Sequence, residues 1–156
     1  MAVFTAIGNT PLIELTRLPH HPKVRILGKL EGSNPGGSIK DRPAYFMIQH
    51  AEKTGQLTPD KTILEATSGN TGIALAMIGT AKGYHVKLCM PECVSMERQH
   101  ILAAYNAEME LTPAREGTDG AIRRARHLFE ENPERYYLPD QYSNEYNVLA
   151  HYETTG

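Results

Sequence analysis

The chain has 156 residues, which suits one domain, or one domain together with part of another. Its formal net charge is −2, and charges of both signs are spread along it without a basic stripe, which argues against a nucleic-acid-binding protein. No apolar stretch approaches the roughly 18 residues that a membrane-spanning helix needs, and no secretory signal is visible. We therefore expect a soluble, cytoplasmic protein.

Apolar runs alternate with segments of helical periodicity along the chain, and turn residues separate them. The run 24–30 (VRILGKL) predicts a strand, and a loop rich in glycine and serine follows it. Residues 41–54 then predict a helix that Gly55 ends. Its apolar positions recur at helical spacing: Ala44, Met47, Ile48 and Ala51.

The alternation is regular between residues 62 and 138. Four short apolar runs predict strands over 62–65, 85–90, 108–111 and 136–138. Three helical segments fall between them, over 71–82, 95–105 and 118–131. The first of these helices is apolar almost all round and is expected to be buried, whereas Ser95 is expected to cap the second and Asn106 to end it. This order predicts an α/β fold with a parallel four-stranded sheet flanked by helices in three layers.

The two ends of the chain do not fit this alternation. The segments before residue 30 and after residue 140 are expected to pack elsewhere, and the last residues, HYETTG, show no obvious terminal helix. The two cysteines, Cys89 and Cys93, match no common zinc pattern, and a disulfide between them would need a sharply bent backbone. Cys89 is expected to be a small buried residue in a reducing compartment.

The segment 33–44, SNPGGSIKDRPA, places Lys40 at the start of a predicted helix. The aligned peptide dipoles put partial positive charge there, which disfavours the ammonium form of Lys40. A neutral amine is what attacks a carbonyl to form a Schiff base. The alternative is an ordinary solvated lysine, which is the commoner outcome for this pattern taken alone.

The segment 66–72, ATSGNTG, lies between a predicted strand and a buried helix. It offers backbone N–H groups, three hydroxyls and one amide at a helix N-terminus, which suits a carboxylate or phosphate. The alternative is a capped helix in which glycine only allows tight packing, and the bare pattern leaves the two open. No Gly-Lys-Ser/Thr follows and no GxGxxG occurs after a strand, so nucleotide-binding loops are disfavoured.

Five motifs together resemble one family in order and spacing. They are GNTPL (8–12), SNPGGSIKDR (33–42), ATSGNTG (66–72), MPECVSMERQ (90–99) and DQYSNEYNVLAHYETTG (140–156). The chain resembles the cysteine synthases (O-acetylserine sulfhydrylases), which are fold-type II pyridoxal-phosphate enzymes, and looks more like their B-type than their A-type. The resemblance covers essentially the whole chain and about half of a usual family member.

The resemblance implies a role for each matching residue. Lys40 matches the lysine that carries pyridoxal 5'-phosphate and later moves the α-proton, and Asn70 matches the amide that bonds to the cofactor's ring hydroxyl. The residues that match the grip on the substrate carboxylate are Thr67, Ser68, Gly69, Thr71 and Gln141. No metal is implied.

The implied reaction is a β-replacement that makes L-cysteine from O-acetylserine and a sulfur donor, sulfide or thiosulfate, in an enzyme that is a homodimer at full length. The family's phosphate-binding glycine/threonine-rich loop and its later Ser or Thr facing the pyridine nitrogen are missing from this sequence. The chain is thus expected to be an amino-terminal half: an arm (1–33) for a missing large domain, a mobile α/β domain (34–141) and the start of the large domain (142–156). Alone, it is expected to bind cofactor poorly, to be weakly active or inactive, and to expose apolar surface.

Two rival functions remain open. One is another enzyme of the same superfamily, a cystathionine β-synthase or a serine/threonine dehydratase. The other is a catalytically incomplete fragment or a binding remnant that keeps only the fold.

Overall fold

The computed structural model describes residues 2–18, 21 and 23–156. Its centre is a four-stranded sheet in the order β5-β4-β3-β6, with every neighbouring pair parallel. The strands are β3 (Thr62–Ala66), β4 (Val86–Pro91), β5 (Glu108–Thr112) and β6 (Tyr136–Tyr137). The sheet predicted from the alternation of apolar runs and helices is therefore confirmed.

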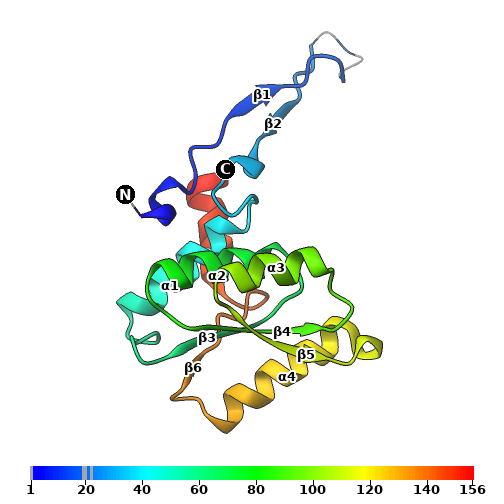
Figure 1. The fold of residues 1–156 in the computed structure, drawn as a ribbon. Helices are drawn as coiled ribbons and strands as arrows, with labels where there is room; N and C mark the ends of the chain where they lie inside the picture. The colour runs from blue at the N-terminus through cyan, green and yellow to red at the C-terminus, as the bar shows by residue number, and fades with distance from the viewer. Residues whose placement is uncertain (1, 19–20, 22) are drawn as a thin grey trace.

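Helices cover both faces of the sheet, as Figure 1 shows. Three lie on one face, α1 (Asp41–Lys53), α2 (Asn70–Ala81) and α3 (Met96–Ala104), and α4 (Gly117–Glu131) lies on the other. Each face has its own apolar core. The α2 helix contacts α1, α3 and the sheet, so it has no broad solvent face and can be apolar almost all round.

The helix ends follow the predicted turn chemistry, with one exception. Gly55, Gly83 and Asn106 take positive φ angles of 72°, 89° and 57° after α1, α2 and α3, and glycine and asparagine tolerate this region best. Ser95 lies at the N-cap position of α3, but the prediction that it caps the helix is wrong for its side chain, which makes no capping hydrogen bond. Its carbonyl instead accepts a hydrogen bond of 3.2 Å from the Gln99 N–H.

A short hairpin projects from the body of the molecule (Figure 1). It pairs β1 (Leu12–Glu14) with β2 (Leu27–Lys29) in antiparallel fashion. The strand predicted over 24–30 is thus too long, since only Leu27–Lys29 pair with β1, although single backbone hydrogen bonds continue at both ends of the pairing. Short 3₁₀ turns accompany the hairpin and the sheet at η1 (Val3–Ala6), η2 (Glu31–Ser33) and η3 (Ala114–Glu116).

The chain continues beyond the sheet into α5 (Glu145–Ala150) and a π-helical turn, η4 (His151–Thr155). The expectation of no terminal helix is therefore wrong. Asn144 supplies the missing signal, because its side chain accepts the Tyr146 N–H at 3.0 Å and caps α5. The α5 helix packs on α1, and the rings of His50 and Tyr146 stack with centroids 3.5 Å apart.

Within the described residues, no helix combines the length and the apolar character needed to cross a lipid bilayer.

Candidate active site

All seven residues predicted to form a site line one hollow of about 400 Å³. We call it the Lys40 pocket. It lies where β3 ends and the loop 67–69 leads into α2, which is the edge of a parallel sheet where ligands usually bind. Its lining residues are Ile39, Lys40, Thr67, Ser68, Gly69, Asn70, Thr71, Arg98, Thr118, Gln141 and Tyr142. The structure thus brings the predicted residues together, while the role of each stays a prediction.

Lys40 is half-buried at the N-cap position of α1. The turn before it is held from inside, because the buried Asn34 side chain donates to the Ser38 carbonyl at 3.0 Å and accepts the Gly8 N–H at 2.9 Å. The Lys40 N–H in turn donates to the Ser38 hydroxyl at 3.1 Å. These bonds fix the backbone that carries Lys40 and leave its amine at the pocket wall.

Asp41, next to Lys40, stabilises the same turn through a hydrogen bond to its backbone. Its side chain is fully buried, and one carboxylate oxygen accepts the Gly36 N–H. Burial raises the pKa of the Asp41 carboxyl, and the charge of Glu31 raises it further, whereas the bond from Gly36 opposes both. A Cβ at Gly36 would run into this carboxylate, being 2.9 Å from its carbon. Position 36 therefore needs glycine for the close approach.

The loop after β3 opens directly into α2. The Thr67 N–H donates to the Cys89 carbonyl at 3.0 Å, and the Gly69 N–H donates to the Thr67 hydroxyl at 3.3 Å. The first N–H groups of α2 have no partner inside the helix and carry the positive end of its dipole. A Cβ at Gly72 would lie 2.9 Å from Thr67 Cγ2, so glycine there lets α2 approach the strand end. The loop can therefore present N–H groups to an anion.

Gln141 reaches this loop from the segment after β6. Its side-chain oxygen accepts the Thr71 hydroxyl at 2.7 Å, across 70 positions of sequence. This bond joins the two groups that the family resemblance assigns to the substrate carboxylate. Because the oxygen of the amide is occupied by Thr71, its NH₂ group is left to donate to a ligand.

The sequence interpretation missed four residues that line the Lys40 pocket: Ile39, Arg98, Thr118 and Tyr142. Arg98, on α3, donates from Nη1 to the Ser68 carbonyl at 2.9 Å and brings a guanidinium to the mouth of the pocket. A single arginine on an exposed helix gives no signal in one sequence. Only the fold places it beside a loop 30 positions away.

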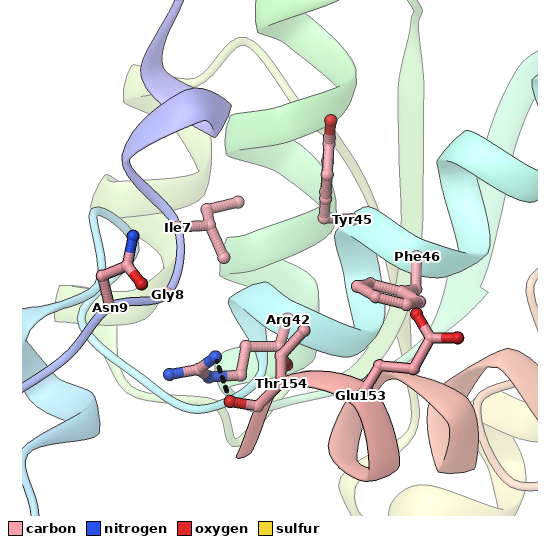
Figure 2. Close-up of a pocket in the computed structure, with 8 residues that line it drawn as sticks. All are labelled: Ile7, Gly8, Asn9, Arg42, Tyr45, Phe46, Glu153 and Thr154. Atoms are coloured by element: carbon pink, nitrogen blue, oxygen red, sulfur yellow. Dashed lines mark hydrogen bonds between the residues drawn. The ribbon is translucent and has the colours of Figure 1, made fainter. Parts of the chain in front are cut away.

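A second hollow, of about 330 Å³, lies between the two ends of the chain (Figure 2). Its wall includes Ile7, Tyr45, Glu153 and the guanidinium of Arg42. Lys40 does not line it. The Arg42 charge is already neutralised by Glu31 at 2.7 Å, so this hollow offers no free cation for an anionic ligand.

The two cysteines are free thiols. Cys89 is buried in β4, as predicted, and burial raises the pKa of its thiol to about 11. Cys93 is exposed. Neither residue lines the Lys40 pocket.

Comparison with known proteins places this geometry in a family. The family model described as "Pyridoxal-phosphate dependent enzyme" matches residues 3–156. The chain is 48% identical to a cysteine synthase of Aquifex aeolicus, over 99% of this chain and 48% of that protein. It is 49% identical to cysteine synthase B of Salmonella typhimurium, over 96% of this chain and 49% of that protein.

A solved structure gives the same result for the fold. The crystal structure of an O-acetylserine dependent cystathionine β-synthase from Helicobacter pylori superposes with a TM-score of 0.91 at 39% identity, over 99% of this chain and 51% of that one. The chain spans about half the length of the curated relatives it matches. The resemblance stated from the motifs is confirmed at the level of the family: the chain belongs to the pyridoxal-phosphate dependent enzymes, among relatives named cysteine synthase.

Proposed function

We propose that this chain supplies the lysine and the carboxylate grip of an enzyme that makes L-cysteine by β-replacement, from O-acetylserine and a sulfur donor. One observation carries the proposal. Lys40, Asn70, the N-terminus of α2 and the Thr71–Gln141 pair all line one pocket. Relatives named cysteine synthase at 48–49% identity support the same reaction.

The residues of the pocket fit part of the cofactor. Lys40 and Asn70 would hold pyridoxal 5'-phosphate, with a primary amine for the aldehyde and an amide for the ring hydroxyl. When bound, the cofactor supplies an aldehyde that condenses with amines and a ring that withdraws electrons from the α-carbon. These two residues account for the aldehyde and the ring hydroxyl only, so the grip on the cofactor from them alone is incomplete.

The chain's own groups have separate tasks in the proposed reaction. The first N–H groups of α2 and the Gln141 amide bind the substrate carboxylate. This contact orients the α C–H bond toward Lys40, whose amine then takes the proton. Closure of the 66–72 loop over the carboxylate would exclude water from the reacting atoms.

B-type specificity is part of the proposal, supported by the relative named cysteine synthase B. A cystathionine β-synthase activity is the favoured alternative, because the Helicobacter pylori protein shares this fold. The nucleophile separates the two: sulfide or thiosulfate against homocysteine. A dehydratase would release a keto acid without any sulfur donor.

The test of the proposed function begins with the lysine. Pyridoxal phosphate added to the chain should give a visible absorbance band and, after borohydride reduction, a mass adduct on Lys40. Lys40→Ala should remove both, whereas Lys53→Ala, an exposed lysine on the same helix, should keep them. An adduct on another lysine would refute the assignment. Absence of any band would favour the incomplete-fragment alternative.

We further propose that the full-length enzyme is a homodimer in a reducing, cytoplasmic setting. The two free thiols are consistent with that setting. Sedimentation of the full-length protein would test the oligomeric state.

A further inference from the structure

Glu65 is a buried acid in the strand that leads into the loop lining the Lys40 pocket. It is the fourth residue of β3, just before the loop that opens into α2, and only 4% of it is exposed. Within the described residues it forms no salt bridge. A carboxylate is costly to bury without a partner, so a buried glutamate at this place calls for a reason.

Both oxygens of Glu65 accept backbone N–H groups. Oε1 accepts from Ala66 at 2.9 Å, and Oε2 accepts from Gln141 at 3.2 Å. The second bond spans 76 positions and ties the end of β3 to the segment after β6. Glu65 thus contacts the backbone of Gln141, which lines the Lys40 pocket, and does not line the pocket itself.

Gln141 is held at three points. Glu65 accepts its N–H, the Asn147 side chain donates to its carbonyl at 2.8 Å, and Thr71 donates to its side-chain oxygen at 2.7 Å. With these groups occupied, the Gln141 NH₂ is the part of the residue that is left to donate. Its position depends on the backbone bond that Glu65 makes.

We propose that Glu65 is a positioning residue for anion recognition in the Lys40 pocket: its ionised carboxylate fixes the Gln141 backbone, so that the Gln141 amide meets the carboxylate of an amino-acid substrate. The proposal deepens the proposed function and rests on it for the identity of the substrate. It does not make Glu65 a catalytic residue, because Glu65 does not line the Lys40 pocket.

The surroundings make this contact sensitive to protonation. Burial raises the pKa of Glu65 to about 7, and the nearby charge of Asp140 raises it, while the backbone N–H groups of Ala66, Gln141 and Asp140 oppose the change. The other titratable groups around Glu65 are the Tyr137 hydroxyl, the Cys89 thiol, and Arg126 and Tyr142, which line the same small cavity. A protonated Glu65 has one acceptor oxygen fewer, so its hydrogen bond with the Gln141 N–H weakens as pH falls through 7.

Hydrogen exchange of the backbone amides in the 156-residue chain, measured without cofactor, tests the hydrogen bond from the Gln141 N–H to Glu65. Glu65→Gln keeps the shape but can accept only one of the two N–H groups, so the Gln141 N–H should exchange about tenfold faster or more. The Thr67 N–H, bonded to the Cys89 carbonyl, serves as internal reference. Glu130→Gln, an exposed glutamate on α4, is the matched control and should leave both rates unchanged. In unaltered protein, Gln141 should lose protection relative to Thr67 between pH 8 and pH 6, which needs no substitution.

Acetate, titrated against the Gln141 side-chain NH₂ resonance, tests anion recognition. Glu65→Gln should raise the Kd of acetate about tenfold, and Glu130→Gln should not change it. Equal exchange rates and equal acetate affinity in Glu65→Gln and unaltered protein would overturn the proposal. Turnover of O-acetylserine by the cofactor-loaded full-length enzyme separates the two proposals. If turnover is absent while Glu65→Gln still weakens acetate binding, the proposed function fails and the positioning role stands.

Discussion

Arg42 holds the two ends of the chain against α1, and its removal should cost more stability than any other single ion-pair substitution in the described chain. Its side chain is 3% exposed. Nε and Nη2 donate to the two oxygens of Glu31 at 2.7 and 2.8 Å, Nη2 also donates to Thr10 at 3.0 Å, and Nη1 donates to the Thr154 carbonyl at 3.0 Å. One guanidinium therefore joins four parts of the chain that are far apart in sequence.

The size of the effect follows from burial. Removing one partner of a buried ion pair leaves the other charge without compensation, which costs about 3–5 kcal/mol. We therefore expect Arg42→Met to lower the free energy of unfolding by about 3–5 kcal/mol, a large part of the 5–15 kcal/mol typical of a domain. Replacing both partners, as in Arg42→Met with Glu31→Leu, should cost less than the sum of the single changes, because no buried charge is then left alone.

Urea denaturation followed by circular dichroism measures these differences. Arg25 and Glu14 provide the control, since they form a comparable two-pronged pair, at 3.1 and 3.0 Å, but their side chains are 71% and 39% exposed. Arg25→Met should cost far less than Arg42→Met, because an exposed ion pair contributes little to stability. Equal losses for Arg42→Met and Arg25→Met, or strictly additive losses in the double variant, would show that burial of the pair does not set its contribution.

Three further outcomes are expected. The bond to Arg42 lowers the pKa of Glu31 from 4.5 to about 2. The ionised Glu31 therefore stabilises the fold above pH 4.5, and this stabilisation is lost as pH falls toward 2. Acid titration should lower the free energy of unfolding by roughly 2–3 kcal/mol, a contribution that the Arg42→Met protein already lacks. Gly72→Ala should destabilise the chain by about 1–3 kcal/mol in thermal unfolding, because its Cβ would crowd Thr67, and an unchanged melting temperature would contradict this packing. A thiol reagent should label Cys93 in the native chain and reach Cys89 only in denaturant, and two fast-reacting native thiols would contradict the burial of Cys89.

The sheet and its helices could be predicted because local signals and tertiary structure agree. The strand runs are short and apolar, the helix over 70–81 is apolar all round, and Gly55 and Gly83 stand where left-handed turns end helices. The pocket could be located for the same reason, since Lys40 and the 66–72 loop both precede helices at the carboxyl edge of a parallel sheet. The position of such an edge follows from the topology of the sheet, and the alternation of strands and helices in the sequence predicts that topology.

The supporting residues could not be predicted because their partners are distant. Glu65 lies in a strand run where an isolated acid reads as a break in an apolar pattern, and its partner Gln141 is 76 positions away. Arg98 reaches Ser68 across 30 positions. The helix after Asn144 escaped prediction because six residues are too few for a clear period. In each case the missing information is the three-dimensional neighbour.

The distribution of exposed apolar side chains supports the proposed division into residues 1–33, 34–141 and 142–156. Of the large apolar side chains most exposed in the described chain, all but Met96 and Leu111 lie in residues 3–30 or 142–152. The accessible surface is 9000 Å², whereas a folded monomer of 17.3 kDa exposes about 7,800 Å². The central segment thus buries most of its large apolar side chains, whereas each flanking segment exposes several of its own. Apolar side chains exposed in this way are typical of a surface that packs against further protein.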